Sequence, residues 1–361
     1  MLTILIGRAK TGKSDWVLRK IAALGESGQQ ILLVPEHASY QAEVDVCRVC
    51  GDHASRYAEV LSFRRLGERV LSITGGISDV TLDSGGKLLT LQRALLETAP
   101  MLTLYRRPSQ KVGFLEQMLA LFDELQCYEV TPERLYEQAQ SLTGATRDKL
   151  LDLSLLYGAY EARLRRPGLD SRDRMTKLCE HLEESAYVRD KNIFIDGFTY
   201  FNAQERRVLS VFLRQARSVT VTLLGEVNSR EEIFAPTLKT MEMLERLAKQ
   251  ENCPVMVEDL TNTDTSALGH LEQHFFGENL PYEGSSVSVR LREASAVYSE
   301  VEQTAADIRR LLAAGKCRCR DITVAARNMG DYMGTIETVF ERYGIPAYIS
   351  RRSDILEKPV L

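Results

Sequence analysis

The amino-terminal part of the chain alternates between short apolar runs and helical periodicity. Apolar runs at Leu2–Ile6 and Ile31–Val34, with a weaker one at Tyr57–Leu61, predict three buried strands. Between the first two runs, apolar residues recur at helical spacing: Trp16, Leu18, Ile21 and Leu24. Strands that alternate with helices are typical of an α/β fold with a mainly parallel sheet and right-handed crossovers.

From about Thr81 to Glu184 the pattern changes to continuous helical spacing. Apolar residues recur three or four positions apart in three groups: Leu88, Leu91 and Leu95; Leu115, Leu119 and Phe122; and Leu150, Leu153, Leu156 and Tyr160. Strand patterns return at Asn192–Phe198 and Val219–Leu224, with a helix through Gln204–Gln215 between them. We therefore predict that residues 1–80 and 188–285 form one discontinuous nucleotide-binding α/β domain, which residues 81–187 interrupt as a helical insert.

A change of composition precedes the last part of the chain. Residues 259–286 are rich in Thr, Asn, Gly, Pro and Ser, which is typical of a connection between domains. The pattern after it predicts strands at Ser286–Leu291 and Asp321–Ala326, and helices at Glu300–Ala313 and Tyr332–Tyr343. Residues 286–361 are therefore expected to begin a second α/β domain, which looks unfinished and indicates an excerpt from a longer protein.

A phosphate-loop motif lies between the first predicted strand and the first predicted helix. Residues Gly7–Ser14 read GRAKTGKS and match GxxxxGK[ST]. Gly7 and Gly12 permit a tight turn that points backbone amides and the helix amino terminus at phosphate oxygens. Lys13 would reach the β and γ phosphates of ATP, and the Ser14 hydroxyl would ligate Mg²⁺. The predicted ATP-binding residues are Gly7, Arg8, Ala9, Lys10, Thr11, Gly12, Lys13 and Ser14. An ordinary glycine turn is the alternative.

A carboxylate follows the strand that resumes the sheet pattern. Asp196 ends the apolar run Ile193–Ile195. A strand that ends in Asp, after a phosphate loop, is the expected source of the carboxylate that completes the Mg²⁺ shell together with Ser14. We therefore assign Asp196 a metal-binding and catalytic role. The alternative is a strand-terminal Asp in a turn.

Composition limits the protein class without deciding it. A chain of 361 residues with 44% hydrophobic content can bury more than one core. The formal charge of −4 argues against a uniformly basic nucleic-acid coat, so any DNA contact must be regional. Seven cysteines, no signal-like amino terminus and no long apolar stretch fit a reduced cytoplasmic protein without a membrane partner.

Segments along nearly the whole chain resemble the amino-terminal, helicase-like part of the AddB (RexB) family. They are GRAKTGKS at residues 7–14, ILLVPEHASYQAE at 31–43, LSFRRLGERV at 61–70, KLLDLSLLYGAYEARL at 149–164, FIDGFTYFNAQERRVL at 194–209 and DITVAARNMGDYMGTIETVFERYGIPAYI at 321–349. This part of the family is similar to superfamily 1 helicases of the UvrD and RecB type. The resemblance implies a RecA-like nucleotide-binding domain with a helical insert like that of subdomain 1B.

The same resemblance implies a function in DNA repair. AddB belongs to the AddAB helicase-nuclease, an ATP-dependent helicase and exonuclease that processes double-strand DNA ends for homologous recombination. The implied partners are the AddA subunit, DNA ends and single-stranded DNA, and the family carries Chi-sequence recognition. A nuclease with a [4Fe-4S] cluster is implied beyond the end of this chain.

Catalytic positions can be transferred from the related helicases. Lys13 and Ser14 match helicase motif I, and Asp196 matches the motif II aspartate. Arg327 matches the motif IV arginine that reaches toward the γ-phosphate in related motors, where it would neutralise transition-state charge. A solvated arginine after a strand is the alternative for Arg327.

DNA-facing positions also follow from the resemblance. Gln41 and the segment Ser62, Phe63, Arg64 and Arg65 match strips that face single-stranded DNA in active motors. Phe63 would stack on a base, and the arginines would neutralise phosphates. The alternative is a core Phe63 with solvated arginines.

The chain departs from the motor pattern around the ATP site. Motors carry an adenine-recognising glutamine well upstream of motif I, but six residues precede Gly7 here. Gly197 replaces the glutamate that orients the attacking water in motors. A positioned acid or base of this kind usually increases the reaction rate roughly 10²- to 10⁴-fold. Thr199 and Tyr200 replace the next two motif II residues. We therefore expect ATP binding with impaired hydrolysis, in a DNA-binding scaffold beside a partner motor. An active translocase and an unrelated phosphate-loop kinase of a small molecule are the alternatives.

Overall fold

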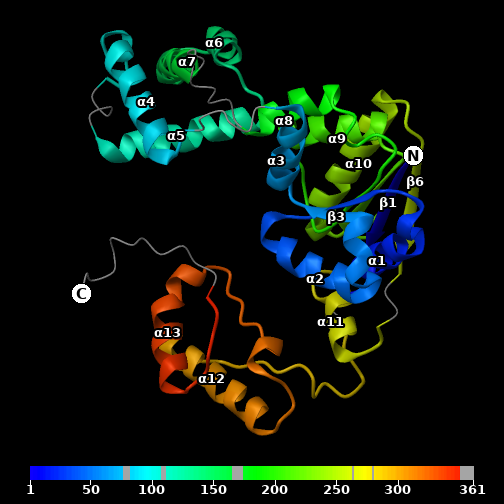
Figure 1. The fold of residues 1–361 in the computed structure, drawn as a ribbon. Helices are drawn as coiled ribbons and strands as arrows, with labels where there is room; N and C mark the ends of the chain where they lie inside the picture. Colours follow the sequence, from blue (N-terminus) through cyan, green and yellow to red (C-terminus); the bar gives the residue numbers. More distant parts are fainter. Residues whose placement is uncertain (76–81, 107–110, 165–173, 262–263, 279, 350–361) are drawn as a thin grey trace. The chain divides into compact units, whose positions relative to one another are not determined.

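The chain folds into two compact units, Met1–Pro281 and Tyr282–Leu361 (Figure 1). A computed structural model describes residues 1–75, 82–106, 111–164, 174–261, 264–278 and 280–349. Each unit has its own apolar core. No helix in these described ranges combines the length and the apolar character that a membrane crossing requires.

Among the described residues, six parallel strands form a single sheet in the order β3-β2-β4-β5-β1-β6. The strands are Leu2–Gly7 (β1), Gln30–Leu33 (β2), Ala58–Leu61 (β3), Asn192–Ile195 (β4), Ser218–Leu224 (β5) and Val255–Leu260 (β6). In this register Ile4 of β1 lies opposite Val221 of β5 and Val257 of β6. The predicted α/β fold with a parallel sheet is confirmed. Because all strands run in one direction, their carboxyl ends meet at one edge, where ligands of open α/β sheets bind.

Helices cover both faces of this sheet (Figure 1). One face packs against α1 (Lys13–Leu24) and α2 (Ser39–Cys50). The other face packs against α3 (Phe63–Thr74), α8 (Arg174–Glu184), α9 (Ala203–Gln215) and α10 (Ala235–Gln250). Double coverage explains why β1 reads as an uninterrupted apolar run: every one of its residues is buried.

The helical insert has a separate core. It consists of α4 (Ser84–Thr98), α5 (Val112–Cys127), α6 (Pro132–Gln140) and α7 (Gly144–Leu164). Phe122 of α5 packs between Tyr157 and Tyr160 of α7, with ring centroids 4.8 and 5.7 Å away. The buried Asp152 carboxylate accepts backbone N–H groups of Thr103, Leu104 and Tyr105 at 2.9, 2.7 and 3.0 Å, which ties the chain after α4 to α7.

Helix α8 belongs to the sheet rather than to the insert. Its residues Leu178, Cys179 and Leu182 are buried in the same core as the strands and α9. The apolar spacing of α8 continued the helical pattern of the preceding segment, and spacing alone does not tell which core a helix joins.

The second unit is held together by two packed helices. Val301, Ala305 and Ile308 of α12 (Val297–Ala313) share a core with Ile336 and Val339 of α13 (Met333–Arg342). The predicted strands Ser286–Leu291 and Asp321–Ala326 are wrong: both segments are irregular or turn in the structure. A strand needs a neighbouring strand to form hydrogen bonds with its backbone N–H and C=O groups, and the described part of this unit contains no such neighbour.

Candidate nucleotide site

The phosphate-loop motif forms a tight connection between β1 and α1. β1 ends at Gly7, and α1 begins at Lys13. Gly12 has a φ of 81°, a left-handed conformation that favours glycine. A side-chain carbon at Gly7 would collide with the Thr11 hydroxyl and approach the Leu260 carbonyl oxygen to 3.0 Å. Both glycines are therefore required by the backbone path of the loop.

Lys13 lies inside the curve of this loop. Its Nζ donates to the carbonyl oxygens of Gly7 and Arg8, both at 2.7 Å, and lies 3.4 Å from Thr11 Oγ1. Burial lowers the pKa of Lys13, while the carboxylates of Asp196 and Glu272 act in the opposite direction. The Ser14 side chain is exposed in the first turn of α1. The structure thus brings the motif I pair to the mouth of the loop.

Asp196 reaches the same edge of the sheet from β4. Its backbone N–H donates to Leu33 O at 3.0 Å, which fixes the turn after the strand. Its Oδ1 accepts a hydrogen bond from the hydroxyl of Thr222 on β5, the strand between β4 and β1. Asp196 therefore lies at the same edge of the sheet as the phosphate loop, and its charge partly opposes the burial that lowers the pKa of Lys13.

Gly197, the position that departs from the motor pattern, has a φ of 82°. A Cβ atom built there would lie 3.4 Å from Pro35 Cδ, an ordinary contact. The space would admit a side chain, but the backbone conformation is one that residues with a Cβ rarely adopt. The glycine is thus part of the local fold and not a neutral replacement for glutamate.

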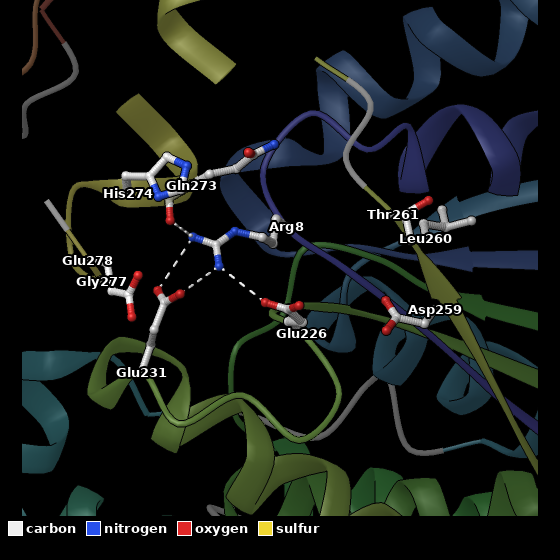
Figure 2. Close-up of a pocket in the computed structure, with 10 residues that line it drawn as sticks. All are labelled: Arg8, Glu226, Glu231, Asp259, Leu260, Thr261, Gln273, His274, Gly277 and Glu278. Carbon is white, nitrogen blue, oxygen red and sulfur yellow. Dashed lines mark hydrogen bonds and ion pairs between the residues drawn. The ribbon is translucent and has the colours of Figure 1, made fainter. Parts of the chain in front are cut away.

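The side chain of Arg8 lies in an acidic cluster, and Figure 2 shows its guanidinium beside Glu226 and Glu231. Its guanidinium lies 3.2 Å from Glu226, 2.8 Å from Glu231 and 3.2 Å from Glu272. Nη2 also donates to the carbonyl oxygens of Glu272 and Gln273 at 2.8 and 3.3 Å. Burial alone would lower the pKa of Arg8, but the carboxylates of Glu231 and Glu272 raise it above its ordinary value.

The partners of Arg8 come from distant parts of the chain. Glu226 and Glu231 follow β5, and Glu272 lies on α11 (Ala267–His274), which follows β6. A cavity of about 480 Å³ adjoins this cluster, with Asp259 and His274 among its lining residues. Sequence reasoning missed these carboxylates because none lies in a motif, and β6 itself was not predicted.

The residues assigned to DNA lie on the helices that follow β2 and β3: Gln41 is on α2, and Ser62 caps the amino terminus of α3, which begins with Phe63, Arg64 and Arg65. Phe63 is 8% exposed, and its ring meets that of Phe198 edge-on at 5.5 Å. Ser62 is 2% exposed and caps α3, because its Oγ accepts the Arg65 N–H at 3.2 Å while it donates to the Glu36 carboxylate. These contacts favour the core alternative for Phe63, since a buried ring cannot stack on a base.

The polar members of this set are held by acidic neighbours. Gln41 is exposed and donates to Asp45 at 3.1 Å. Arg64 pairs with Glu68 at 3.3 Å, and Arg65 pairs with Glu43 at 2.5 Å. Paired arginines contribute less net positive charge to a DNA surface than isolated ones would.

Two predicted site features remain without a structural test. Arg327 is exposed and belongs to the second unit, and its role toward the phosphate loop stays a prediction. In the described residues, no cluster of three His, Cys, Asp or Glu side chains could hold a metal ion by itself. A phosphate-loop Mg²⁺ does not depend on such a cluster, because Mg²⁺ takes one or two protein oxygens plus phosphates and waters.

Comparison with known proteins identifies the family. The family model described as "ADDB, N-terminal" matches residues 4–272. The chain is also similar to curated bacterial proteins whose names describe one of the subunits of an ATP-dependent helicase/deoxyribonuclease. It is 32% identical over 376 residues to the protein of Thermoanaerobacter sp. (strain X514) and 34% identical over 386 residues to that of Moorella thermoacetica (strain ATCC 39073 / JCM 9320). The corresponding protein of Clostridioides difficile (strain 630) is 29% identical over 382 residues.

These matches also show how much of the relatives the chain represents. Each match covers 100% of this chain and 33% of the relative, so the chain spans about a third of their length. The chain therefore belongs to the AddB family, and it corresponds to the amino-terminal part of that family's proteins.

Proposed function

We propose that this chain is the helicase-like part of a helicase-nuclease subunit that processes double-strand DNA ends for homologous recombination. In this proposal it binds ATP with impaired hydrolysis and acts as a DNA-binding scaffold beside an AddA-type motor subunit. The observation that carries the proposal is the nucleotide site itself: a complete phosphate loop and Asp196, followed by Gly197 in a left-handed conformation.

The residues present fit Mg²⁺-ATP. The amides of the loop and of the α1 amino terminus would bind phosphate oxygens, and Lys13 would exchange its carbonyl partners for the β and γ phosphates. Ser14 and Asp196 would hold Mg²⁺, with the Thr222 hydroxyl orienting the Asp196 carboxylate. Bound Mg²⁺ neutralises charge that develops on the phosphates.

Weak hydrolysis follows from the turn after Asp196. The backbone at Gly197 has a φ of 82°, so a glutamate at this position would require strain. The chain thus holds ATP without the carboxylate that would orient an attacking water. Bound ATP would then serve as a structural or regulatory ligand, while the partner supplies the motor activity.

The DNA-binding role is assigned to the loops after β2, β3 and β4, which are neighbours in the sheet. Two tyrosines that the motif comparison did not single out as DNA contacts, Tyr40 and Tyr200, follow β2 and β4 and are 77% and 65% exposed. Exposed aromatic rings are platforms for unpaired bases, worth about 1–3 kcal/mol per base. With Arg64 and Arg65 held by glutamates, stacking would contribute more than phosphate contacts.

The wider assignment rests on membership of the AddB family. It includes a heterodimer with an AddA-type subunit, Chi recognition during end processing, and a cytoplasmic location. The nuclease with its [4Fe-4S] cluster would belong to the part of the family protein that this chain does not span.

ATP turnover tests the proposal. We expect the purified chain to bind ATP, to hydrolyse it slowly with or without single-stranded DNA, and to lose binding on Lys13→Ala. Rapid DNA-stimulated turnover that Lys13→Ala abolishes would replace the scaffold with an active translocase. Phosphorylation of a small acceptor without DNA would instead indicate a kinase.

Binding of a fluorescent single-stranded oligonucleotide across a salt series tests the DNA role. We expect binding at low salt that weakens with salt and that weakens further on Tyr40→Ala or Tyr200→Ala. Tyr136→Ala is the matched control, since Tyr136 is also exposed but lies on α6 of the insert. No binding at low salt would leave a role in docking the partner.

A further inference from the structure

Glu272 contacts the phosphate loop directly. From the last turns of α11, its Oε1 lies 3.2 Å from Arg8 Nε and 3.4 Å from the backbone N of Ala9. Nε is the guanidinium nitrogen nearest the loop backbone, whereas Glu231 contacts the outer nitrogens Nη1 and Nη2 at 2.8 and 3.4 Å. Glu272 is thus the carboxylate of the Arg8 cluster that reaches an amide of the loop.

Its charge also acts on Lys13. Burial lowers the pKa of Lys13, and the two carboxylates that oppose this lowering are those of Asp196 and Glu272. Asp196 would share Mg²⁺ with the nucleotide, so its negative charge is compensated when ATP binds. Glu272 has no such role in the proposed site, and the arriving phosphates would meet a second negative charge beside the same lysine and the same loop.

We infer that Glu272 sets the phosphate preference of the nucleotide site, because its carboxylate competes with the phosphate chain for the loop and for Lys13. The competition grows with the number of phosphates placed beside Lys13, so it penalises ATP more than ADP and leaves AMP, which has no β or γ phosphate, unaffected. When a triphosphate binds, the Glu272 carboxylate separates from the loop, and the end of α11 loosens with it. This inference rests on the proposed nucleotide site. It adds that the site is selective among nucleotides and that nucleotide binding is coupled to the conformation of α11.

A purely structural role for Glu272 predicts a different outcome. If the carboxylate only anchors Arg8, its loss would weaken the loop and lower the affinity for every nucleotide. Glu231 provides the matched control, since it also binds the Arg8 guanidinium but through the outer nitrogens. The two substitutions Glu272→Gln and Glu231→Gln therefore remove one negative charge each from the same cluster.

Nucleotide titrations of the full chain test the inference. Trp16 is the single tryptophan and lies two positions after Ser14, so its fluorescence reports binding at the loop. We expect Glu272→Gln to tighten Mg²⁺-ATP binding by about 5-fold or more, with a smaller gain for ADP and none for AMP. The gain should shrink at high salt, and Glu231→Gln should change ATP affinity by less than about 2-fold.

Equal or weaker ATP binding by Glu272→Gln, or the same gain in Glu231→Gln, would overturn the inference while leaving the nucleotide site intact. If neither wild type nor variant binds any nucleotide, the proposed site fails, and the inference fails with it.

Amide hydrogen exchange of the wild type gives a test that needs no variant. ATP should speed exchange at residues 267–274, and AMP should not. Slower exchange of α11 with ATP would mean that the helix closes on the nucleotide, contrary to the inferred separation.

Discussion

At the scale of single residues, Lys13 combines a buried position with a charge that the proposed function needs. Burial lowers its pKa below the ordinary 10.5, because the ammonium loses hydration inside the loop. In the folded protein Lys13 therefore loses its proton at a lower pH than in the unfolded chain. The unfolded state binds more protons between these two pKa values, so this group makes the protein more stable as pH rises through that window.

Lys13→Met removes this titration and makes the effect measurable. The free energy of unfolding of the wild type should rise relative to that of Lys13→Met as pH increases toward 10.5. Urea denaturation at several alkaline pH values would measure the difference, in which the titrations of all other groups cancel. A difference that stays flat or falls with pH would contradict the depressed pKa.

Gly197 yields a second prediction at this scale. Because its φ is 82°, Gly197→Ala should lower the free energy of unfolding by about 1–3 kcal/mol. Gly197→Asn is the control, since asparagine tolerates left-handed backbone better than alanine, and it should cost less. Thermal or urea denaturation would rank the two variants. Equal costs would mean that the backbone conformation is not the cause.

At the scale of elements, sequence patterns correctly predicted the helices and strands whose formation depends on residues close together in the chain. The strand, glycine turn and helix around Gly7–Ser14 and the strand before Asp196 all lie within short windows, and all form as expected. The strands expected at 286–291 and 321–326 failed because alternation does not supply a partner strand. β6 was missed for the opposite reason: Val255–Leu260 is short and partly exposed, and it becomes a strand by pairing with β1.

Contacts over long sequence distances limited the prediction of the site. The sequence pattern at Phe63 fits either a base-stacking strip or a core position, and the contact of its ring with Phe198 favours the core. The pairing of Arg8 with Glu272 joins residues 264 positions apart, and no periodicity or motif encodes such a contact. The sequence therefore predicted the strand, turn and helix of the loop but not the acidic cluster around Arg8.

Helix α8 gives a prediction that separates the sheet core to which it contributes from the core of the insert. Leu182 of α8 is buried with the sheet, and Leu156 of α7 is buried in the insert. Each change to alanine should cost about 2–5 kcal/mol of the stability of its own core. In hydrogen exchange, Leu182→Ala should release amides of β2 and β4, and Leu156→Ala those of α4, α5 and α7. Faster exchange in the insert but not in the sheet on Leu182→Ala would assign α8 to the insert.

At the scale of the whole molecule, the division into Met1–Pro281 and Tyr282–Leu361 predicts separable stabilities. Val339 is fully buried between α12 and α13, so Val339→Asp places an uncompensated carboxylate in the core of the second unit. We expect α12 and α13 to lose amide protection while ADP binding, followed at Trp16, changes by less than about 2-fold, because the contact predicted for Arg327 of this unit is with the γ-phosphate, which ADP lacks. Val324→Asp, at an exposed position of the same unit, is the control. Loss of nucleotide binding on Val339→Asp would mean that the phosphate loop depends on the second unit.

The sheet order also has a consequence for synthesis. β1 leaves the ribosome before β5 and β6, the two strands between which it lies, and those strands are made only after the insert has been translated. The nascent apolar run Leu2–Ile6 therefore stays unpaired until β5 and β6 have been made. Strand pairing across such long sequence separations is slow, and chains with unpaired strands are prone to aggregation. The proposed nucleotide site needs β1 in its place in the sheet, so we expect a newly made chain to form this site only after translation has passed β6.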